Sequence, residues 1–421
     1  MLFRVIFTRL LIIIGFIAPP ILLAEEVKLE LSNDLSLSSL TDKVYQQHPA
    51  HHNDLAQQQQ INANSSLANA RFADAASINL MHQNDVIGSN DGLQEWEGSV
   101  DLPLWLAGQK QQQLTLSEKM TAELPAYKKQ IRLDASAIVR ELIWKAVLAD
   151  NATSQAYQVW QSAQKLEQDV VARVKAGELA GTARLLASTN AIEMHSQYLL
   201  AQAELEHALT SYRRITGEDS LPQQYEETLA ENTIGEHHSA ALIPQQHPSL
   251  MIMEQQINTL RTKQDIAYFD GAINPVLSVG VRRERGAGHG EDFNNSIGVG
   301  ISFAFDDTVY RQPAVANAAK ELADAEISRQ QLERELNIIL FSHLHDLETK
   351  QQQLELVKEQ NTTTQQYLAL QQRAFDLGEI DLVSLLRSQS LANMSTNRKL
   401  ALEIDIKHMI ANVNQALGVT L

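Results

Sequence analysis

The chain has 421 residues, of which only 5% are aromatic and 18 are glycine, a composition typical of long helices and coiled coils. Its 34 basic and 51 acidic residues give a net charge of −17, which argues against nucleic-acid binding because phosphate backbones attract basic proteins. Since the chain has no cysteine, disulfides, thiol catalysis, thiolate metal sites and a lipid attached to an N-terminal cysteine are all excluded.

The N-terminal segment carries the pattern of a secretory signal peptide. Two arginines precede an apolar run at residues 10–17, and the small residue Ala24 stands just before two glutamates. We therefore predict a signal peptide over residues 1–24 that is removed from an exported protein. The alternative, a retained membrane anchor, is disfavoured by Pro19 and Pro20, which interrupt the apolar stretch. No later stretch approaches the roughly 20 apolar residues of a membrane-spanning helix, so any membrane crossing would use strands.

The rest of the chain is a tandem duplication with its copies about 200 residues apart. Each copy has a His-Pro pair near its start, and the string Gln-Gln-Ile-Asn occurs at 59–62 and again at 255–258. Further on, Gly177 and Gly378 are each followed by a glutamate and, a few residues later, by a pair of leucines. Several matches in the same order are difficult to explain by chance, so we interpret them as one repeated unit.

We divide the mature chain into two structural repeats and a linker. The first repeat covers residues 25–217, and the second covers residues 245–421. Residues 218–244 contain two prolines and a glycine and show no helical pattern. We predict that they form an equatorial segment outside the helical body.

Each repeat has one short region in which apolar residues alternate with small or polar ones, the period of a β-strand. We predict strands at about 77–82 and 95–104 in the first repeat, and at about 276–282 and 296–305 in the second. Alternation of this kind is typical of strands with lipid on one side and water on the other. In the last strand the residues expected to face lipid are Ile297, Val299, Ile301, Phe303 and Phe305.

A half-buried hairpin in a soluble domain is the alternative interpretation of these strands. Lipid exposure is favoured by the small and polar second face, by the predicted export, and by the lack of another sheet for the hairpins to pack against. The acidic side chains of Glu97 and Asp101 would then face a water-filled lumen. Because a membrane barrel needs at least about eight strands and one chain supplies four, the sequence predicts an oligomer.

A long stretch compatible with helix follows each hairpin, at residues 109–176 and 311–377. At 1.5 Å per residue, each could reach roughly 100 Å. Gly177 and Gly378 follow these stretches in the position that glycine takes after a helix end, which predicts a reversal of the chain. A second helix is predicted to return from each glycine, at about 182–215 and 382–417.

The order of helix, hairpin, long helix, glycine turn and returning helix, present twice, resembles the TolC-like outer membrane efflux proteins over nearly the whole mature chain. Residues 103–110 are similar to the family's step from strand into long helix, and residues 375–378 are similar to its hairpin tip. The resemblance implies a mainly α fold with a small membrane β part, in which a trimer forms a twelve-stranded β-barrel on a long α-helical, coiled-coil barrel. The length and the missing cysteine are closer to the CzcC-like branch, which serves heavy-metal pumps.

The resemblance implies the outer membrane channel component of a tripartite efflux system, a passive conduit for export across the periplasm and outer membrane of a Gram-negative bacterium. Its cargo would be metal cations, as in heavy metal resistance, or drugs. The implied partners are the other copies of a homotrimer, a periplasmic adaptor (membrane fusion) protein, an inner-membrane RND-type pump and outer membrane lipid. No cofactor, metal site or nucleic acid is implied, and the protein would not be lipidated.

The resemblance also places the adaptor at the glycine turns, which lie far from the outer membrane. The residues expected to dock the adaptor are Gly177, Gly378, Glu178 and Glu379. In the family, acidic residues six and nine positions after the tip glycine close the channel, but here Ser384 and Arg387 hold those places. Closure must then use other charges near the tip, and our candidates for the aperture are Arg184, Asp381 and Arg387.

The sequence has no motif of an enzyme. A nucleotide-binding loop, a nucleophile elbow and a zinc-protease motif are all missing, and no catalytic residue is predicted. The 13 histidines invite a metal site, but surface and capping roles account for them. His48 and His247 hold the same position in the two repeats, where helix capping suffices. The alternative function, a soluble periplasmic coiled-coil scaffold, leaves two hairpins with one apolar face unexplained.

Overall fold

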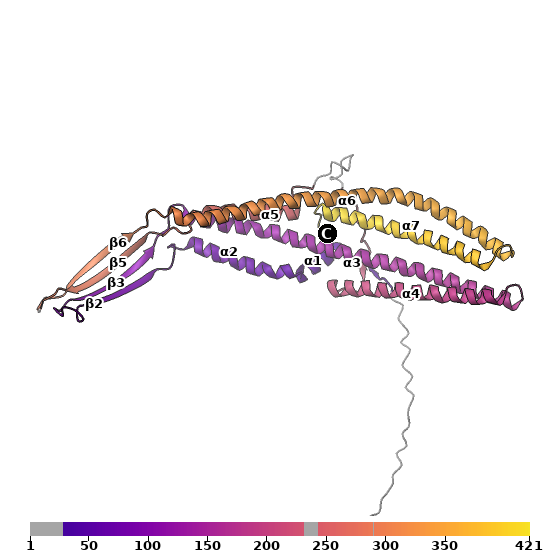
Figure 1. Ribbon diagram of the computed structural model, residues 1–421, viewed down its shortest axis with the longest axis horizontal. Helices are drawn as coiled ribbons and strands as arrows, with labels where there is room; N and C mark the ends of the chain where they lie inside the picture. The colour runs from indigo at the N-terminus through magenta and orange to yellow at the C-terminus, as the bar shows by residue number, and fades with distance from the viewer. Residues whose placement is uncertain (1–27, 231–242, 289) are drawn as a thin grey trace, which may run out of the picture.

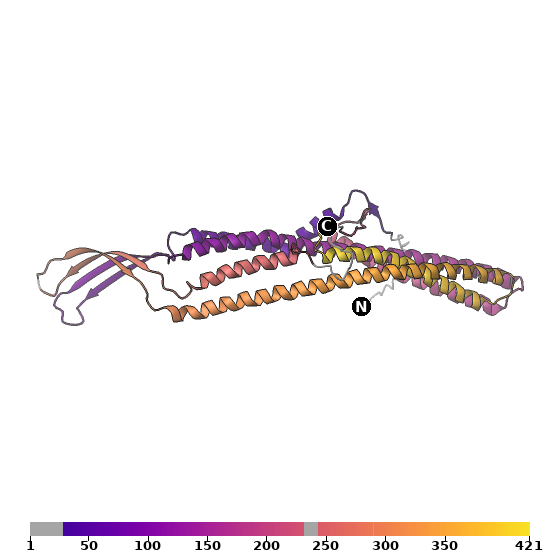
Figure 2. The same cartoon turned by 90° about the horizontal axis from the view of Figure 1, so that it is seen from above.

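The structure, a computed structural model, describes residues 28–230, 243–288 and 290–421. The signal peptide predicted over residues 1–24 and part of the predicted linker, residues 231–242, lie outside this description. The described chain forms a long rod with a four-stranded sheet at one end and two helical hairpins at the other (Figure 1). The view from above shows the same arrangement (Figure 2).

The first half of the chain contains eight elements that run from the middle of the rod to the sheet and then back along its full length (Figure 1). In chain order they are β1 (Leu31–Ser32), α1 (Leu37–Gln47), the 3-10 helix η1 (Pro49–His52), α2 (Asn53–Asn69), β2 (Ser77–Asn84), β3 (Gln94–Pro103), α3 (Gln109–Lys175) and α4 (Gly181–Thr216).

The second half repeats this course after a short strand that pairs with β1. Its elements are β4 (Leu221–Pro222), α5 (Pro248–Ala267), β5 (Val276–Arg285), β6 (Asn294–Ser302), α6 (Thr308–Asp376) and α7 (Leu382–Ala416). The predicted order of helix, hairpin, long helix and returning helix is therefore present in each half. No helix among the described residues is both long enough and apolar enough to cross a membrane.

One predicted strand ends earlier than expected. We predicted the last strand to reach residue 305, but β6 ends at Ser302, so Phe303 and Phe305 lie beyond it. Ser302 pairs with Val276, the first residue of β5, and the residue before Val276 is Pro275. The carbonyl of Pro275 accepts a hydrogen bond from the N–H of Leu104 at 2.7 Å, so the backbone before Val276 turns its hydrogen-bonding groups toward the β3 side and not toward β6.

The two repeated histidines begin their helices as N-caps. The Nδ1 atom of His48 accepts a hydrogen bond from the N–H of Ala50 at 3.2 Å, and that of His247 accepts one from Ser249 at 3.2 Å. Each histidine is followed by a proline in the first helical turn, where the missing N–H costs nothing. The capping role predicted for both residues is confirmed.

The hydrophobic core runs along the helices and does not extend into the sheet. In the middle of the rod, Trp144 and Tyr212 are fully buried where α3 and α4 meet α1. Leu340 and Leu344 of α6 are buried against α7 at the spacing expected of helices packed side by side. Near the tips, Phe375 is buried in a cluster that joins both helical hairpins.

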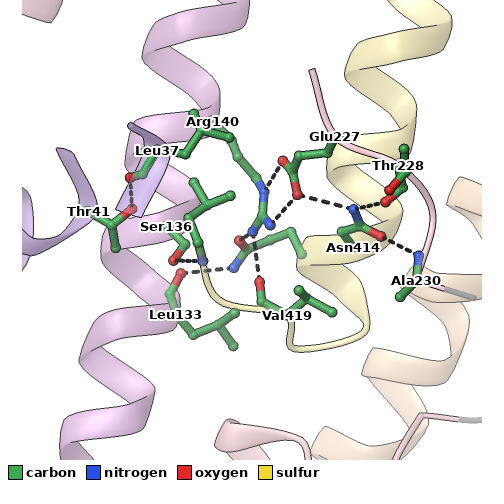
Figure 3. A network of polar contacts seen from close by, with 12 residues as sticks. Leu37, Thr41, Leu133, Ser136, Arg140, Glu227, Thr228, Ala230, Asn414 and Val419 are labelled. Carbon is green, nitrogen blue, oxygen red and sulfur yellow. Dashed lines mark hydrogen bonds and ion pairs between the residues drawn. The ribbon is translucent and has the colours of Figure 1, made fainter. Parts of the chain in front are cut away.

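A buried polar network fixes the start of the linker to the helical body (Figure 3). Arg140 of α3 is only 3% exposed, and its guanidinium donates two hydrogen bonds to the carboxylate of Glu227, at 2.8 and 2.7 Å. Asn414 of α7 donates to the same carboxylate at 3.1 Å and to the carbonyl of Thr228 at 2.9 Å. Because an unpaired buried charge is costly, this pairing holds the linker against α3 and α7.

Candidate functional site: the two ends of the molecule

The sheet has one apolar face. Its strands are antiparallel in the order β2-β3-β5-β6, and the pairing places Ile78, Val100, Val279 and Val299 in one row. Side chains two positions apart on a strand point to the same face, so the neighbouring apolar rows share it. The apolar members of this face are Ile78, Leu80, Val100, Leu102, Leu277, Val279, Val281, Ile297, Val299 and Ile301.

The opposite face is mainly small, polar and charged, with the exposed Met81 as its large apolar member. Gly298 and Gly300 lie on it, and a β-carbon at either position would meet no other atom within 4 Å. Glu97 and Asp101 also lie on this face, as the alternation predicted. Arg282 pairs there with Glu95 at 2.6 Å, so charges of both signs gather on this side of the sheet. One face of the sheet therefore suits an apolar environment, and the other suits water.

Both edges of the sheet are open. The strands β2 and β6 each pair with one neighbour only, and every residue of both is exposed. Each edge therefore carries a row of backbone N–H and C=O groups that no described strand of this chain pairs. These two rows are the natural place for a further strand to join the sheet.

The helical tip between α3 and α4 is built around Gly177. Its φ of 83° lies in the left-handed region that favours glycine. The N–H of Gly177 donates to the carbonyl of Val174 at 3.1 Å, and that of Glu178 donates to Arg173 at 2.9 Å. These are the two bonds of a Schellman motif, which satisfies the last carbonyls of α3.

The tip between α6 and α7 repeats this turn at Gly378, whose φ is 74°. Here Gly378 donates to Phe375 at 3.0 Å, and Glu379 donates to Ala374 at 2.8 Å. Both glutamates lie beside their glycines on the exposed surface, as do the glycines themselves. The four residues expected to dock an adaptor thus form two equivalent exposed turns at one end of the rod.

A charged residue that sequence reasoning missed joins the two tips. Arg173 of α3 pairs with Asp376 of α6 at 3.0 Å and with Asp169 of its own helix at 2.9 Å, and it stacks over the ring of Phe375 at 5.1 Å. Burial alone would lower the pKa of Arg173, but the two carboxylates outweigh burial and raise it. The guanidinium therefore stays charged and holds one hairpin against the other.

The three aperture candidates are not brought together within the chain. Asp381 is the N-cap of α7: its carboxylate accepts a hydrogen bond from the N–H of Ser384 at 2.8 Å. Hydrogen bonds from the side chain of Ser384 and from its N–H lower the pKa of the carboxyl group. Arg184 and Arg387 are exposed, and neither forms an ion pair with a described residue of the chain.

The two leucine pairs that follow the tip glycines are not equivalent. Leu385 is fully buried, whereas Leu185 is 62% exposed. Counted from the helix starts at Gly181 and Leu382, Leu185 corresponds to Leu386, so the pairs are out of step by one residue. Each glycine is followed within a few residues by a leucine pair, but the two pairs differ in register and in burial, and α4 presents the side chain of Leu185 to its surroundings.

The outermost helices of the hairpin end carry exposed apolar stripes. The helices pack in the order α4, α3, α7, α6, so α4 and α6 have one free flank each. Among the exposed apolar residues of each helix, three near the tips are spaced by seven residues or a multiple of seven, the spacing of a coiled-coil contact. They are Leu185, Ile192 and Leu199 on α4, Leu356 and Leu370 on α6, and Leu377 directly after α6.

No group of three or more histidine, aspartate or glutamate side chains among the described residues is placed to hold a metal ion. His343 of α6 and His408 of α7 lie in the middle of the rod, and burial lowers the pKa of both imidazoles. His408 stacks on Trp144 at 5.7 Å, which gives it a packing role. These histidines therefore belong to the helical core.

No protein-family model matches the sequence, and no curated protein sequence matches it. Solved structures, however, share its fold. The Campylobacter jejuni CmeC outer membrane channel has a TM-score of 0.70 at 14% identity over 94% of this chain and 89% of CmeC. The outer membrane protein VceC from Vibrio cholerae has a TM-score of 0.68 at 13% identity over 91% and 96% of the two chains. The open state of the Neisseria gonorrhoeae MtrE outer membrane channel has a TM-score of 0.66 at 14% identity over 91% and 89%. The chain thus has the fold of outer membrane channel proteins.

Proposed function

We propose that the protein is the outer membrane channel of a tripartite efflux system of the TolC-like type. It is a passive, non-catalytic conduit that three copies close around a water-filled bore, in the outer membrane of a Gram-negative bacterium and through its periplasm. The observation that carries this proposal is the four-stranded sheet with one apolar exposed face, one polar face and two open edges.

The sheet supports a barrel because most of its apolar face is exposed, with Leu102 and Leu277 half-buried. Ile297, Val299 and Ile301 are 79%, 72% and 61% exposed, although large apolar side chains are usually buried. Lipid would cover this face, and water would cover the charged one. Because every backbone group in lipid must be paired, the open edge of β6 would join β2 of the next copy. Three chains of four strands then close a barrel without edges.

The helices support the same head-to-tail closure at the other end of the molecule. Leu185 of α4 lies eight residues after its tip glycine, and Leu370 of α6 lies eight residues before its own. Leu199 and Leu356 are likewise each twenty-two residues from their tip glycines. The two exposed stripes therefore stand at equal heights on opposite flanks, where α6 of one copy would pack on α4 of the next.

The tips are the proposed meeting place with an adaptor. Gly177 with Glu178 and Gly378 with Glu379 form two similar exposed turns per chain, and a trimer would present six of them in a ring. Arg184, Asp381 and Arg387 are proposed to approach their counterparts across the aperture. An inner-membrane RND-type pump would supply the energy and select the cargo, which we propose to be metal cations or drugs, and we propose that the protein belongs to the CzcC-like heavy-metal branch.

Two neighbouring residues on opposite faces of β6 test the barrel. Ile301 lies on the apolar face, and an arginine there should cost about 2 to 4 kcal/mol if the site is near the membrane midplane. Gly300 lies on the polar face with open space around it, so an arginine there should assemble normally and lower single-channel conductance in planar bilayers.

The measurement compares the amount of each variant in the outer membrane with its conductance. We expect Ile301→Arg to reduce assembly and Gly300→Arg to reduce only the conductance. Equal effects of the two substitutions would contradict the assignment of the faces. Mature protein that stays soluble without detergent would instead support the periplasmic scaffold.

A further inference from the structure

The apolar face of the sheet contains a hollow of about 740 Å³ near the ends of the strands that lie farthest from the helices. Gly98 has no side chain and leaves a gap in the middle of the face, beside Leu80, Val281 and Ile297. A β-carbon at Gly98 would already come within 3.2 Å of Leu80. The hollow is therefore apolar, narrow at its floor and open to the surroundings.

A polar and aromatic row closes the hollow on the side toward the strand ends. The pairing places His82, Trp96, Arg283 and Asn295 side by side on the apolar face, directly after the row of Gly98. His82 and Trp96 stack with their ring centroids 3.9 Å apart, and Trp96 is 55% exposed. Aromatic side chains in such rows mark the level of lipid headgroups in membrane barrels.

Arg283 is the unusual member of this row. Its guanidinium lies over the ring of Phe293 at 4.5 Å, and no acidic side chain among the described residues pairs with it. The preceding residue, Arg282, points to the other face and is neutralised by Glu95 and Glu284, at 2.6 and 2.8 Å. Arg285, two residues along β5, lies on the same face and over the same ring at 5.2 Å, but its Nε donates to the carbonyl of Gly92 at 3.1 Å. Neither arginine has an acidic partner among the described residues, and Arg283 keeps its N–H donors free while the aromatic ring holds its guanidinium.

We propose that this hollow and Arg283 form a binding site for a phosphate-bearing lipid of the outer leaflet. Arg283 would bind the phosphate through paired hydrogen bonds, and an acyl chain would lie over Gly98 between Leu80 and Val281. Trp96 would rest at the headgroup level between the two. This site rests on the proposed outer membrane location, because the strand ends far from the helices would then face the outer leaflet.

Arg282 and Arg283 provide a matched pair of substitutions. The full-length protein is purified in a neutral detergent and titrated by native mass spectrometry with lipid A carrying two phosphates, and with the same lipid after removal of its phosphates. We expect Arg283→Gln to weaken binding of the phosphorylated lipid by about tenfold or more, since a charge-assisted bond is lost. Arg282→Gln, on the opposite face, should bind as the wild type does, and neither substitution should affect the dephosphorylated lipid.

Quenching of Trp96 gives a second readout that needs no arginine variant. The contribution of Trp96 to the tryptophan fluorescence is the part that disappears in Trp96→Phe. Lipid with bromine atoms near its headgroup should quench this part. Equal weakening by Arg282→Gln and Arg283→Gln, unchanged binding in Arg283→Gln, or no binding by the wild type would overturn the lipid site. If the protein enters bilayers and conducts but gives any of these results, the lipid site is contradicted and the proposed channel is not. A protein that does not enter bilayers contradicts the channel itself.

Discussion

At the scale of single residues, the tip shows which charges have partners in the chain and which do not. Arg173 reaches Asp376 on the other hairpin, although about 200 residues separate them in the sequence. A pattern read along one helix cannot reveal this pair, because arginine in a last helical turn is also favoured by the helix dipole alone. Asp381, by contrast, caps its own helix, a role that its place before α7 could have suggested.

Replacing Asp381 with asparagine separates its charge from its capping role. Asparagine caps a helix as well as aspartate does, so α7 should start normally. If Asp381 pairs with arginines of neighbouring copies in the closed aperture, Asp381→Asn should raise single-channel conductance and the uptake of a bulky antibiotic. Asp324→Asn, an equal change of charge on the exposed part of α6, is the control. Unchanged conductance and uptake at normal assembly would remove Asp381 from the aperture.

The buried cap His247 predicts how stability depends on pH. Burial lowers its pKa below the usual 6.5, and the nearby carbonyl of Ala416 offsets this only in part. The unfolded chain therefore binds a proton at a higher pH than the folded chain does, so stability is lost as the pH falls below about 6.5. His247→Asn keeps a capping side chain and should lose less thermal stability than the wild type between pH 7 and pH 5. The same loss in both proteins would contradict a buried neutral His247; the exposed His52 is the control position.

At the scale of elements, the sequence predicted the helices more closely than the strands. The long helices were expected at 109–176 and 311–377 and occupy Gln109–Lys175 and Thr308–Asp376, because their glycine stops are local signals. The last strand was expected to include Phe303 and Phe305, but β6 ends at Ser302, opposite the first residue of β5. Alternation in one strand does not show which residue lies across from it, so this limit was not visible in the sequence.

The turn at Gly378 allows a test of adaptor docking. A tryptophan there should abolish efflux while the trimer still reaches the outer membrane, because a bulky side chain would block the exposed turn. The tryptophan should destabilise the folded protein by about 1 to 2 kcal/mol, because a side chain at a positive φ strains the backbone. It should cause no clash, because no other atom lies within 4 Å of a β-carbon at this position. Gly378→Ala has the same backbone cost but little bulk, and it should retain efflux. Normal efflux by Gly378→Trp would move the docking site away from this turn.

At the scale of the whole molecule, one chain is an open structure at both ends. The sheet has free edges on β2 and β6, and the helical end has apolar stripes on α4 and α6. The sequence predicted the open sheet from the number of strands alone. It did not predict the stripes, because residues such as Leu185 look like core positions until the order α4, α3, α7, α6 shows which flanks are free. Both ends suggest the same closure, from the flank of one copy to the opposite flank of the next.

Cross-linking of these two flanks tests the closed ring most directly, and the chain has no cysteine of its own to interfere. Within one chain, α3 and α7 separate Leu185 on α4 from Leu370 on α6. In membranes from cells that produce the double variant Leu185→Cys, Leu370→Cys, oxidation should yield covalent species of two and three chains, and no larger ones. Neither single variant should cross-link. A double variant that stays a single chain, or single variants that form dimers, would contradict the head-to-tail trimer and with it the proposed channel.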